Sequence, residues 1–159
     1  ARLGLSHLQF RKVYASFRTF PIRVGDTLGG TSGPCFPDQE ELSWDKVSDF
    51  RGVETLEKTT VTQRVRRVFS FSWTSFKRAL SVIQPEVVFM NFMNYLGPGL
   101  DGATTLDPFR ENSLAWLFLS VVMEHCDKNG VWELILGTGA RSRDMIYLEK
   151  GTCGWNQKA

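Results

Sequence analysis

A threonine- and arginine-rich segment is the part of this chain best suited to bind an anion. It reads Thr59-Thr60-Val61-Thr62-Gln63-Arg64-Val65-Arg66-Arg67. Alternate side chains of an extended segment share a face, so Arg64 and Arg66 would point the same way. A guanidinium fork matches a carboxylate or a phosphate, and threonine hydroxyls would add donors for the same anion. A solvated basic strand or an RNA-contacting patch would have the same composition.

Two asparagines, Asn91 and Asn94, interrupt the most apolar run of the chain, residues 87–96. A buried amide without hydrogen bonds costs about 1–3 kcal/mol, so each needs a partner. Ligands of open α/β sheets bind outside the carboxyl ends of the strands, and Asn94 lies near such an end. An amide carries donors and acceptors that suit the edge of a nucleobase. The alternative is that both amides bond neighbouring backbone.

A glycine-bracketed turn, Gly137-Thr138-Gly139-Ala140-Arg141, directly follows another predicted buried strand. Glycine lets the backbone approach a ligand closely. The loop over residues 25–37 is rich in glycine and proline and is similarly permissive. Many such turns are simple connections, so neither loop is specific in isolation.

Helices alternating with buried strands position these segments, a pattern that favours an α/β fold. We predict strands from residue 13 to a break at Pro21, and over residues 87–96, 131–136 and 145–148. The run 87–96 is expected to be buried on both faces. Helices are expected within 39–50 from Ser43, over 76–83 from Ser75, and from Asn112 to residue 124. Residues 151–159 are expected to form a loose tail.

Composition narrows the function classes. The chain has 159 residues, 42% of them hydrophobic, which suffices for one domain or a large part of a bigger one. Its net charge of +2 gives no global reason to expect nucleic acid or a membrane surface as partner. Three widely spaced cysteines, Cys35, Cys126 and Cys153, predict reduced thiols in a cytoplasmic protein. No apolar run approaches the ~20 residues that span a bilayer, and no signal-peptide pattern opens the chain.

Taken in order, the motifs resemble those of the adenylosuccinate synthetase family, over roughly residues 13–148. The family's Arg-Val-Gly and Gly-Pro-Phe-Pro elements are similar to Ile22-Arg23-Val24-Gly25 and Gly33-Pro34-Cys35-Phe36-Pro37. Its aspartate loop, Thr-Thr-Thr-Gly-Arg-x-Arg-Arg, is similar to residues 60–67. Its Thr-Lys-Leu-Asp strand and closing Ser-Thr-Gly-Pro-x-Arg are similar to residues 91–94 and 137–143. The resemblance implies an α/β fold that is the C-terminal part of an adenylosuccinate synthetase-like, P-loop-related mixed sheet, over residues 1–150, with a flexible tail at 151–159.

The resemblance also implies a ligase of purine nucleotide biosynthesis. Such an enzyme joins L-aspartate to IMP, GMP or dGMP after a nucleoside triphosphate phosphorylates O6. Aspartate would be bound by Thr60, Val61, Thr62 and Arg64. The nucleotides would be bound by residues from all the motifs: Arg23, Val24, Gly25, Arg66, Asn91, Asn94, Thr138 and Gly139.

Other parts of the family pattern are missing from this sequence. The family's phosphate loop, catalytic aspartate and catalytic histidine belong to an N-terminal part, so no catalytic residue or metal ligand is assigned here. Mg²⁺ would accompany the triphosphate, with its ligands outside this chain. The chain alone is expected to be inactive without that region or a second chain. The family dimerises, so a homodimer is expected.

Two departures from the family pattern carry information. Gln63 replaces the family's glycine, which leaves the conformation of the aspartate loop open. Asn94 replaces an aspartate that accepts from guanine, whereas an asparagine can accept from the 6-amino group of adenine and donate to N1. ATP or dATP is therefore expected rather than GTP, and the replacement resembles the phage-type branch that makes 2-aminoadenylosuccinate from dGMP. The alternatives are a non-catalytic nucleotide-binding or interaction module and, less favoured by the balanced charge, a small RNA-binding domain.

Overall fold

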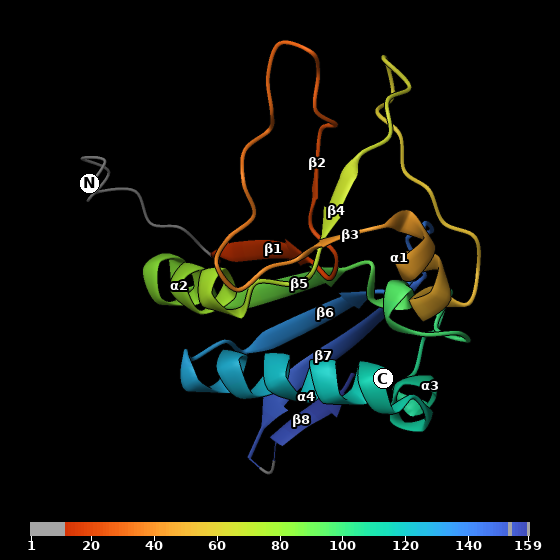
Figure 1. Ribbon diagram of the computed structural model, residues 1–159. Coiled ribbons are helices and arrows are strands. Elements are labelled where there is room, and N and C mark those ends of the chain that lie inside the picture. The colour runs from red at the N-terminus through yellow and green to blue at the C-terminus, as the bar shows by residue number, and fades with distance from the viewer. Residues whose placement is uncertain (1–11, 153, 159) are drawn as a thin grey trace.

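The computed structural model describes residues 12–152 and 154–158, and its centre is a five-stranded mixed sheet (Figure 1). The strand order is β1-β5-β6-β7-β8. Three neighbouring strands are parallel: β1 (Tyr14–Arg18), β5 (Val87–Asn91) and β6 (Glu133–Gly137). The antiparallel strands β7 (Met145–Gly151) and β8 (Gly154–Gln157) extend the sheet. The predicted α/β class with a mixed sheet is confirmed.

Two helices, α2 (Trp73–Ile83) and α4 (Ser113–Lys128), lie against the sheet. Their side chains meet between the helices, where the rings of Trp73 and Phe118 are 5.2 Å apart. Strand residues that share one buried core with these helices are Val88, Met90, Leu134, Leu136, Ile146 and Leu148. Because the helices follow β4 and precede β5 and β6, they work as the crossovers that parallel strands require.

The apolar run at residues 87–96 is a strand only over β5. Phe92 then adopts a left-handed backbone with φ 61°, and the 3-10 turn η1 (Met93–Leu96) follows. The hydroxyl of Thr19 donates to the Phe92 carbonyl at 2.7 Å and holds this bend. The predicted strand over 87–96, buried on both faces, is therefore wrong in its second half, and Phe89 in its first half is only partly buried. Both the strand and the buried turn are apolar, so composition does not separate them.

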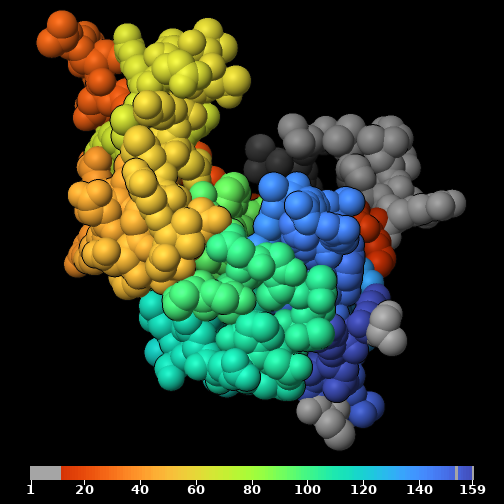
Figure 2. Space-filling model, turned by 90° about the vertical axis from the view of Figure 1, so that its right-hand side faces the viewer, coloured from red at the N-terminus to blue at the C-terminus, as the bar shows by residue number. Residues whose placement is uncertain are grey.

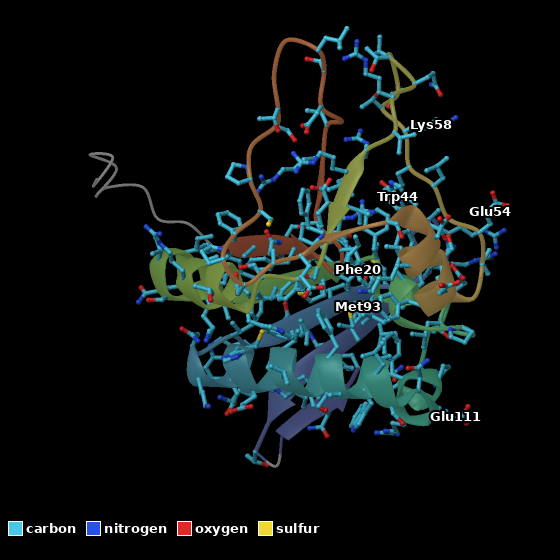
Figure 3. All side chains as sticks on the ribbon, in the orientation of Figure 1. Phe20, Trp44, Glu54, Lys58, Met93 and Glu111 are labelled. Carbon is cyan, nitrogen blue, oxygen red and sulfur yellow. The ribbon has the colours of Figure 1, made fainter. Side chains whose placement is uncertain are left out.

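A small antiparallel sheet stands above the main one (Figure 1). Its order is β2 (Ile22–Arg23), β4 (Arg67–Phe69), β3 (Glu41–Leu42). Two loops rise from it side by side, residues 24–37 and residues 58–66, and together they are called the arm. Figure 3 shows Lys58 on the arm, above Trp44 on α1.

Side-chain caps set where the helices begin. The predicted cap Ser43 accepts from Lys46 N at the start of α1 (Trp44–Arg51). For α2 the predicted cap Ser75 is wrong, because Ser72 accepts from Ser75 N at 3.0 Å and the helix begins one residue after it. The predicted cap Asn112 is confirmed for α4.

Two further differences concern short elements. A short helix, α3 (Asp107–Glu111), was not predicted. Within the expected loose tail, Gly154–Gln157 form β8, and Gln157 accepts from Leu106 N at 3.2 Å and donates to the Thr104 carbonyl at 2.8 Å. These long-range hydrogen bonds, which the local sequence does not reveal, attach the segment to the loop before α3, and pairing with β7 adds it to the sheet.

The predictions about the cysteines and about membrane-spanning segments can be compared with the described residues only. Cys35 and Cys126 are free thiols, and burial raises the pKa of Cys126 to about 12. Cys153 lies outside the described residues. Within residues 12–152 and 154–158, no helix combines the length and the hydropathy needed to cross a bilayer.

Candidate functional site

A cleft of about 670 Å³ opens at the carboxyl ends of β5 and β6. Its walls come from the end of α1, the bend between β5 and η1, the loop before α3 and the turn between β6 and β7. In Figure 2, the green surface near residues 90–96 is set back between the yellow-orange and the blue surface. The cleft brings together Asn91, Asn94 and Gly139, which the sequence predicted for one site.

Asn94 is the most constrained polar residue of the cleft. It follows the strand end in η1 and is only 5% exposed. Its Nδ2 donates to Asp101 Oδ1 at 2.7 Å, and within the described chain no group donates to its Oδ1. The predicted alternative, an amide bonded to neighbouring backbone, does not describe this residue.

Asp101 joins Asn94 to α1. Arg51, the last residue of that helix, donates to Asp101 from Nη2 at 2.7 Å and from Nε at 3.4 Å. Burial alone would raise the pKa of Asp101, but the hydrogen bonds from Arg51 and Asn94 outweigh it and lower that pKa. Asp101 is therefore an ionised acceptor at neutral pH.

Tyr95 connects the cleft to the base of the arm. Its ring lies 4.8 Å from the guanidinium of Arg51, and its hydroxyl donates to Glu57 at 3.0 Å. Glu57 also pairs with Arg18, whose guanidinium lies 3.5 Å from the ring centroid of Phe92. Burial, reinforced by the Glu57 carboxylate, raises the pKa of Tyr95 to about 12, so its phenol keeps its proton and donates.

Asn91 is only partly buried and uses its side-chain donors within the sheet. Its Nδ2 donates to Ser16 Oγ at 2.8 Å and to the Phe17 carbonyl at 3.3 Å, both on β1. The predicted backbone-bonded alternative therefore applies to this amide in part. Asn91 lines the cleft beside Phe89 and Phe92, whose rings supply apolar surface on which a planar base could stack.

The turn between β6 and β7 is organised by Asp144. Its Oδ2 accepts from Arg141 N at 2.9 Å, and a Cβ atom on Gly139 would meet that oxygen at 2.5 Å. Thr138 is fully buried and donates its hydroxyl to the Ala103 carbonyl at 2.7 Å. Thr138 thus supports the turn from its buried side, whereas Gly139 forms part of the cleft wall.

The remaining predicted residues lie on or beneath the arm rather than in the cleft. Arg23 lies between aromatic rings, 5.0 Å from Phe69 and 5.6 Å from Phe36, and donates to the Pro34 carbonyl. Val24 is exposed and Gly25 packs on Val65 of the other loop. Arg23 therefore ties the first loop to the small sheet.

The second loop closes as a tight turn around Thr59. The Thr59 backbone N–H donates to the Arg64 carbonyl at 2.9 Å, and its hydroxyl contacts that of Thr62. Gln63 has φ 52°, the left-handed conformation that glycine adopts readily, and its side chain donates to the Thr60 carbonyl at 2.9 Å. The replacement of the family's glycine is thus accommodated by a glycine-like backbone.

Charges on the arm divide into free and paired groups. Thr60, Val61, Thr62 and Arg64 are all exposed. Within the described residues, the guanidinium of Arg64 has no hydrogen-bond or ion-pair partner. Arg67, by contrast, pairs with Glu41 at 2.6 Å and Asp26 at 3.1 Å. This pairing removes one cation from the basic segment and weighs against an RNA-binding surface.

Helix α1 contacts both regions. At its first residue, Trp44 Nε1 donates to the Arg66 carbonyl at 2.6 Å, and at its last, Arg51 bonds Asp101. The Arg66 side chain is directed to the Lys58 carbonyl, 3.4 Å away. Arg51, Tyr95 and Asp101 were not predicted from sequence; an acidic residue in the Gly/Pro-rich loop at 97–108 was the available signal.

The described residues do not form a metal site of their own. Across residues 12–152 and 154–158, no cluster of three or more His, Cys, Asp or Glu side chains could hold a metal ion. His125 is near the end of α4, where its ring lies 6.0 Å from that of Trp73, away from the cleft. The described residues therefore do not fit a Mg²⁺ cage.

Comparison with known proteins supports a phage-type, adenylosuccinate synthetase-like branch for this chain. No family model matches the chain. The chain is 52% identical over 93 residues to the N6-succino-2-amino-2'-deoxyadenylate synthase of Salmonella phage PMBT28. It is 46% identical over 98 residues to the enzyme of the same name from Vibrio phage phiVC8. These alignments cover 55% and 62% of this chain but 24% and 26% of the relatives, so the chain spans about a quarter of their length.

A solved structure is similar over most of the chain. It is the succinoaminodeoxyadenylate synthetase of cyanophage S-2L bound to dGMP and to dATP as an energy donor. The TM-score is 0.60 and the identity 29%, over 84% of this chain and 32% of that one. The predicted resemblance, its phage-type branch and the mixed-sheet fold are therefore confirmed.

Proposed function

We propose that this chain is the recognition part of a phage-type ligase that joins L-aspartate to dGMP with dATP or ATP as phosphate donor. The observation that carries the proposal is the anchored amide of Asn94 in the strand-end cleft, in a chain that is 52% identical over 93 residues to a protein named N6-succino-2-amino-2'-deoxyadenylate synthase. The cleft would hold the base of the donor. Asn94 would accept from its 6-amino group, while Phe89 and Phe92 would contact the ring faces.

The arm would hold aspartate through Thr60, Val61, Thr62 and Arg64. The exposure of these residues and the absence of a described partner for the Arg64 guanidinium support this assignment. A free guanidinium can bind a carboxylate bidentately, and the hydroxyls would bind the remaining oxygens. Arg66 and Val24 would reach the nucleotide sugars, whereas Arg23 and Gly25 would position the loop that carries Val24.

In the proposed reaction, the γ-phosphoryl group of the donor passes to O6 of the purine monophosphate. The amine of aspartate then attacks C6, and inorganic phosphate leaves. This chain would hold the aspartate amine and the donor base in place, which is catalysis by positioning. The catalytic groups, the triphosphate site and the Mg²⁺ ligands would belong to a region outside the described residues. Homodimerisation and a cytoplasmic location stay predictions.

Ligand-dependent thermal stability of the purified chain tests the recognition roles. dATP or ATP should raise the melting temperature more than dGTP does, because ligand binding to the native state stabilises it. L-aspartate should raise it for the wild type and Arg110→Ala but not for Arg64→Ala, since Arg110 is an exposed residue of α3 whose guanidinium pairs with Asp107 and lies 5.8 Å from the Trp116 ring. A chain that responds to no nucleotide would contradict the proposal.

The non-catalytic alternative requires a second measurement. The gene's complete product, supplied with dGMP, L-aspartate and dATP, should release inorganic phosphate and form the succino-nucleotide. If it binds the ligands and forms no product, the chain is a nucleotide-binding module rather than part of a ligase.

A further inference from the structure

We infer that Asp101, held by Arg51, fixes the orientation of the Asn94 amide and thereby makes the cleft select a 6-amino purine over a 6-oxo purine. This inference rests on the proposed function, because it concerns the base of the donor nucleotide. It assigns the choice of base to a residue that need not touch the base itself. Asp101 is thus a positioning residue.

The two purines present opposite patterns to an amide. Adenine offers a donor at the 6-amino group and an acceptor at N1, whereas guanine offers an acceptor at O6 and a donor at N1. A carboxamide has an acceptor on one side and donors on the other. Rotated by half a turn, it matches either base equally well. An asparagine by itself therefore does not discriminate, and something must hold its amide in one orientation.

Asp101 supplies that constraint. A carboxylate only accepts hydrogen bonds, so the group facing it at 2.7 Å must be the NH₂ of Asn94. Rotating the amide would bring its carbonyl oxygen to the carboxylate, and two acceptors at that distance repel each other. Asn94 is also buried, so water does not easily relieve the mismatch. The Oδ1 atom is left as the free acceptor of this amide.

Arg51 keeps Asp101 in place and charged. It donates to both carboxylate oxygens, and it is itself held by a hydrogen bond to Thr55 Oγ1 at 3.1 Å and by the ring of Tyr95. The lowered pKa of Asp101 agrees with this geometry, because a protonated Asp101 could donate and would tolerate either amide orientation. The hydrogen bonds from Arg51 to Asp101 and from Asn94 to Asp101 thus connect α1 to the cleft and hold the Asn94 amide in one orientation.

The test compares dATP and dGTP binding by isothermal titration calorimetry for wild type, Asp101→Asn and Asp101→Glu. The wild type should bind dATP more tightly. In Asp101→Asn the amide at 101 can also turn its NH₂ toward Asn94 Oδ1, provided that Arg51 gives up one of its two hydrogen bonds to this residue. The second orientation of Asn94 then becomes accessible, and the preference for dATP should fall severalfold. Asp101→Glu keeps an acceptor-only group and should retain the preference for dATP. Asp107→Asn, an exposed acid on α3 that pairs with Arg110, is the matched control and should keep the wild-type ratio.

The ratio of the two affinities separates positioning from folding, because general destabilisation weakens both. An unchanged dATP preference in Asp101→Asn would overturn the inference and leave the proposed function standing. A wild type that binds neither nucleotide would overturn the proposed function as well. If Asp101→Asn binds neither, Asp101→Glu decides: loss of its dATP preference while binding persists would also overturn the inference.

Discussion

Gly25 stands against the backbone of Val65 so closely that a Cβ atom on the glycine would lie 2.6 Å from the Val65 carbonyl oxygen. The two residues belong to different loops of the arm, so this contact sets how closely the loops approach at their base. The obstacle is backbone, which has no rotamer to move out of the way. The glycine is therefore required by space rather than by an unusual φ.

Gly25→Ala should push the loops apart. We expect a loss of about 1–3 kcal/mol of stability, as is typical of overpacking, and a weaker response to L-aspartate. Differential scanning fluorimetry with and without L-aspartate measures both effects. Gly29→Ala is the control, because a Cβ there meets nothing within 4 Å and should change neither value. Equal behaviour of the two variants would mean that the loops are not held by this contact.

The backbone conformation of Gln63 predicts that two substitutions at this position change the melting temperature differently. Its left-handed backbone (φ 52°) costs an L-residue roughly 1–2 kcal/mol, a cost that glycine does not have. Gln63→Gly should therefore keep or slightly raise the melting temperature, although it loses the hydrogen bond to Thr60. Gln63→Val should lower it, because a β-branched side chain is poorly tolerated there. Thermal melts that rank valine above glycine would contradict this conformation of the loop.

Exchanging the two groups at Asn94 and Asp101 should reverse base preference. In Asn94→Asp alone, two carboxylates would meet where the hydrogen bond of 2.7 Å now lies, so affinity for both nucleotides should fall. In the double variant, the new amide at 101 can donate to the carboxylate at 94 and accept from Arg51 with its oxygen, if Arg51 gives up one of its two present hydrogen bonds to this residue. The second oxygen of that carboxylate is then free to accept from guanine, and dGTP should bind about tenfold more tightly than dATP.

A double-mutant cycle measures this coupling. The two single variants and the double variant are titrated with both nucleotides, and the effects of the singles are compared with that of the pair. Strictly additive effects would show that positions 94 and 101 act independently, contrary to their direct contact.

The carboxylate of Asp38 is expected to stabilise the start of α2 in a pH-dependent way. It accepts from the backbone N–H of Thr74 at 2.8 Å and from Ser72 Oγ at 2.7 Å, and these bonds hold its pKa below the ordinary value. A carboxyl with a lowered folded-state pKa stabilises the fold above its unfolded pKa of about 3.9, and this contribution disappears as pH falls through the folded value. Asp38→Ala should therefore melt below the wild type at pH 7, and the gap should narrow below about pH 4. A difference in melting temperature that stays constant from pH 7 to pH 3.5 would contradict a stabilising role of the ionised Asp38.

Local signals explain which parts of the fold were predictable. The caps at Ser43 and Asn112 and the strands β6 and β7 follow from short-range pattern, and they were predicted close to their observed positions. The end of β5 was not, because the bend at Phe92 depends on a hydrogen bond from Thr19, far away in the chain. Strand β8 pairs with the directly preceding β7, but its residues are mostly polar and do not stand out as a strand in the sequence.

The candidate site divides in the same way. Asn94 and Gly139 could be placed at a strand end from the sequence, because polar residues and glycines stand out beside apolar runs. Arg51 and Asp101 could not, since their relation arises only when α1 packs beside η1. What each motif binds stays a prediction from the sequence resemblance, whereas the contact between Asn94 and Asp101 could be found only in the folded structure.

Helix α1 carries a consequence for ligand design. It holds the Arg66 carbonyl through Trp44 at one end and Asp101 through Arg51 at the other, across a rise of about 12 Å. A bisubstrate ligand carrying both an adenine and a dicarboxylate would need a spacer matched to this helix. The helix would couple the two proposed sites: whatever factor aspartate applied to dATP affinity, dATP would apply to aspartate affinity. The indole of Trp44, bonded directly to the arm, offers an intrinsic fluorescent reporter of that linkage.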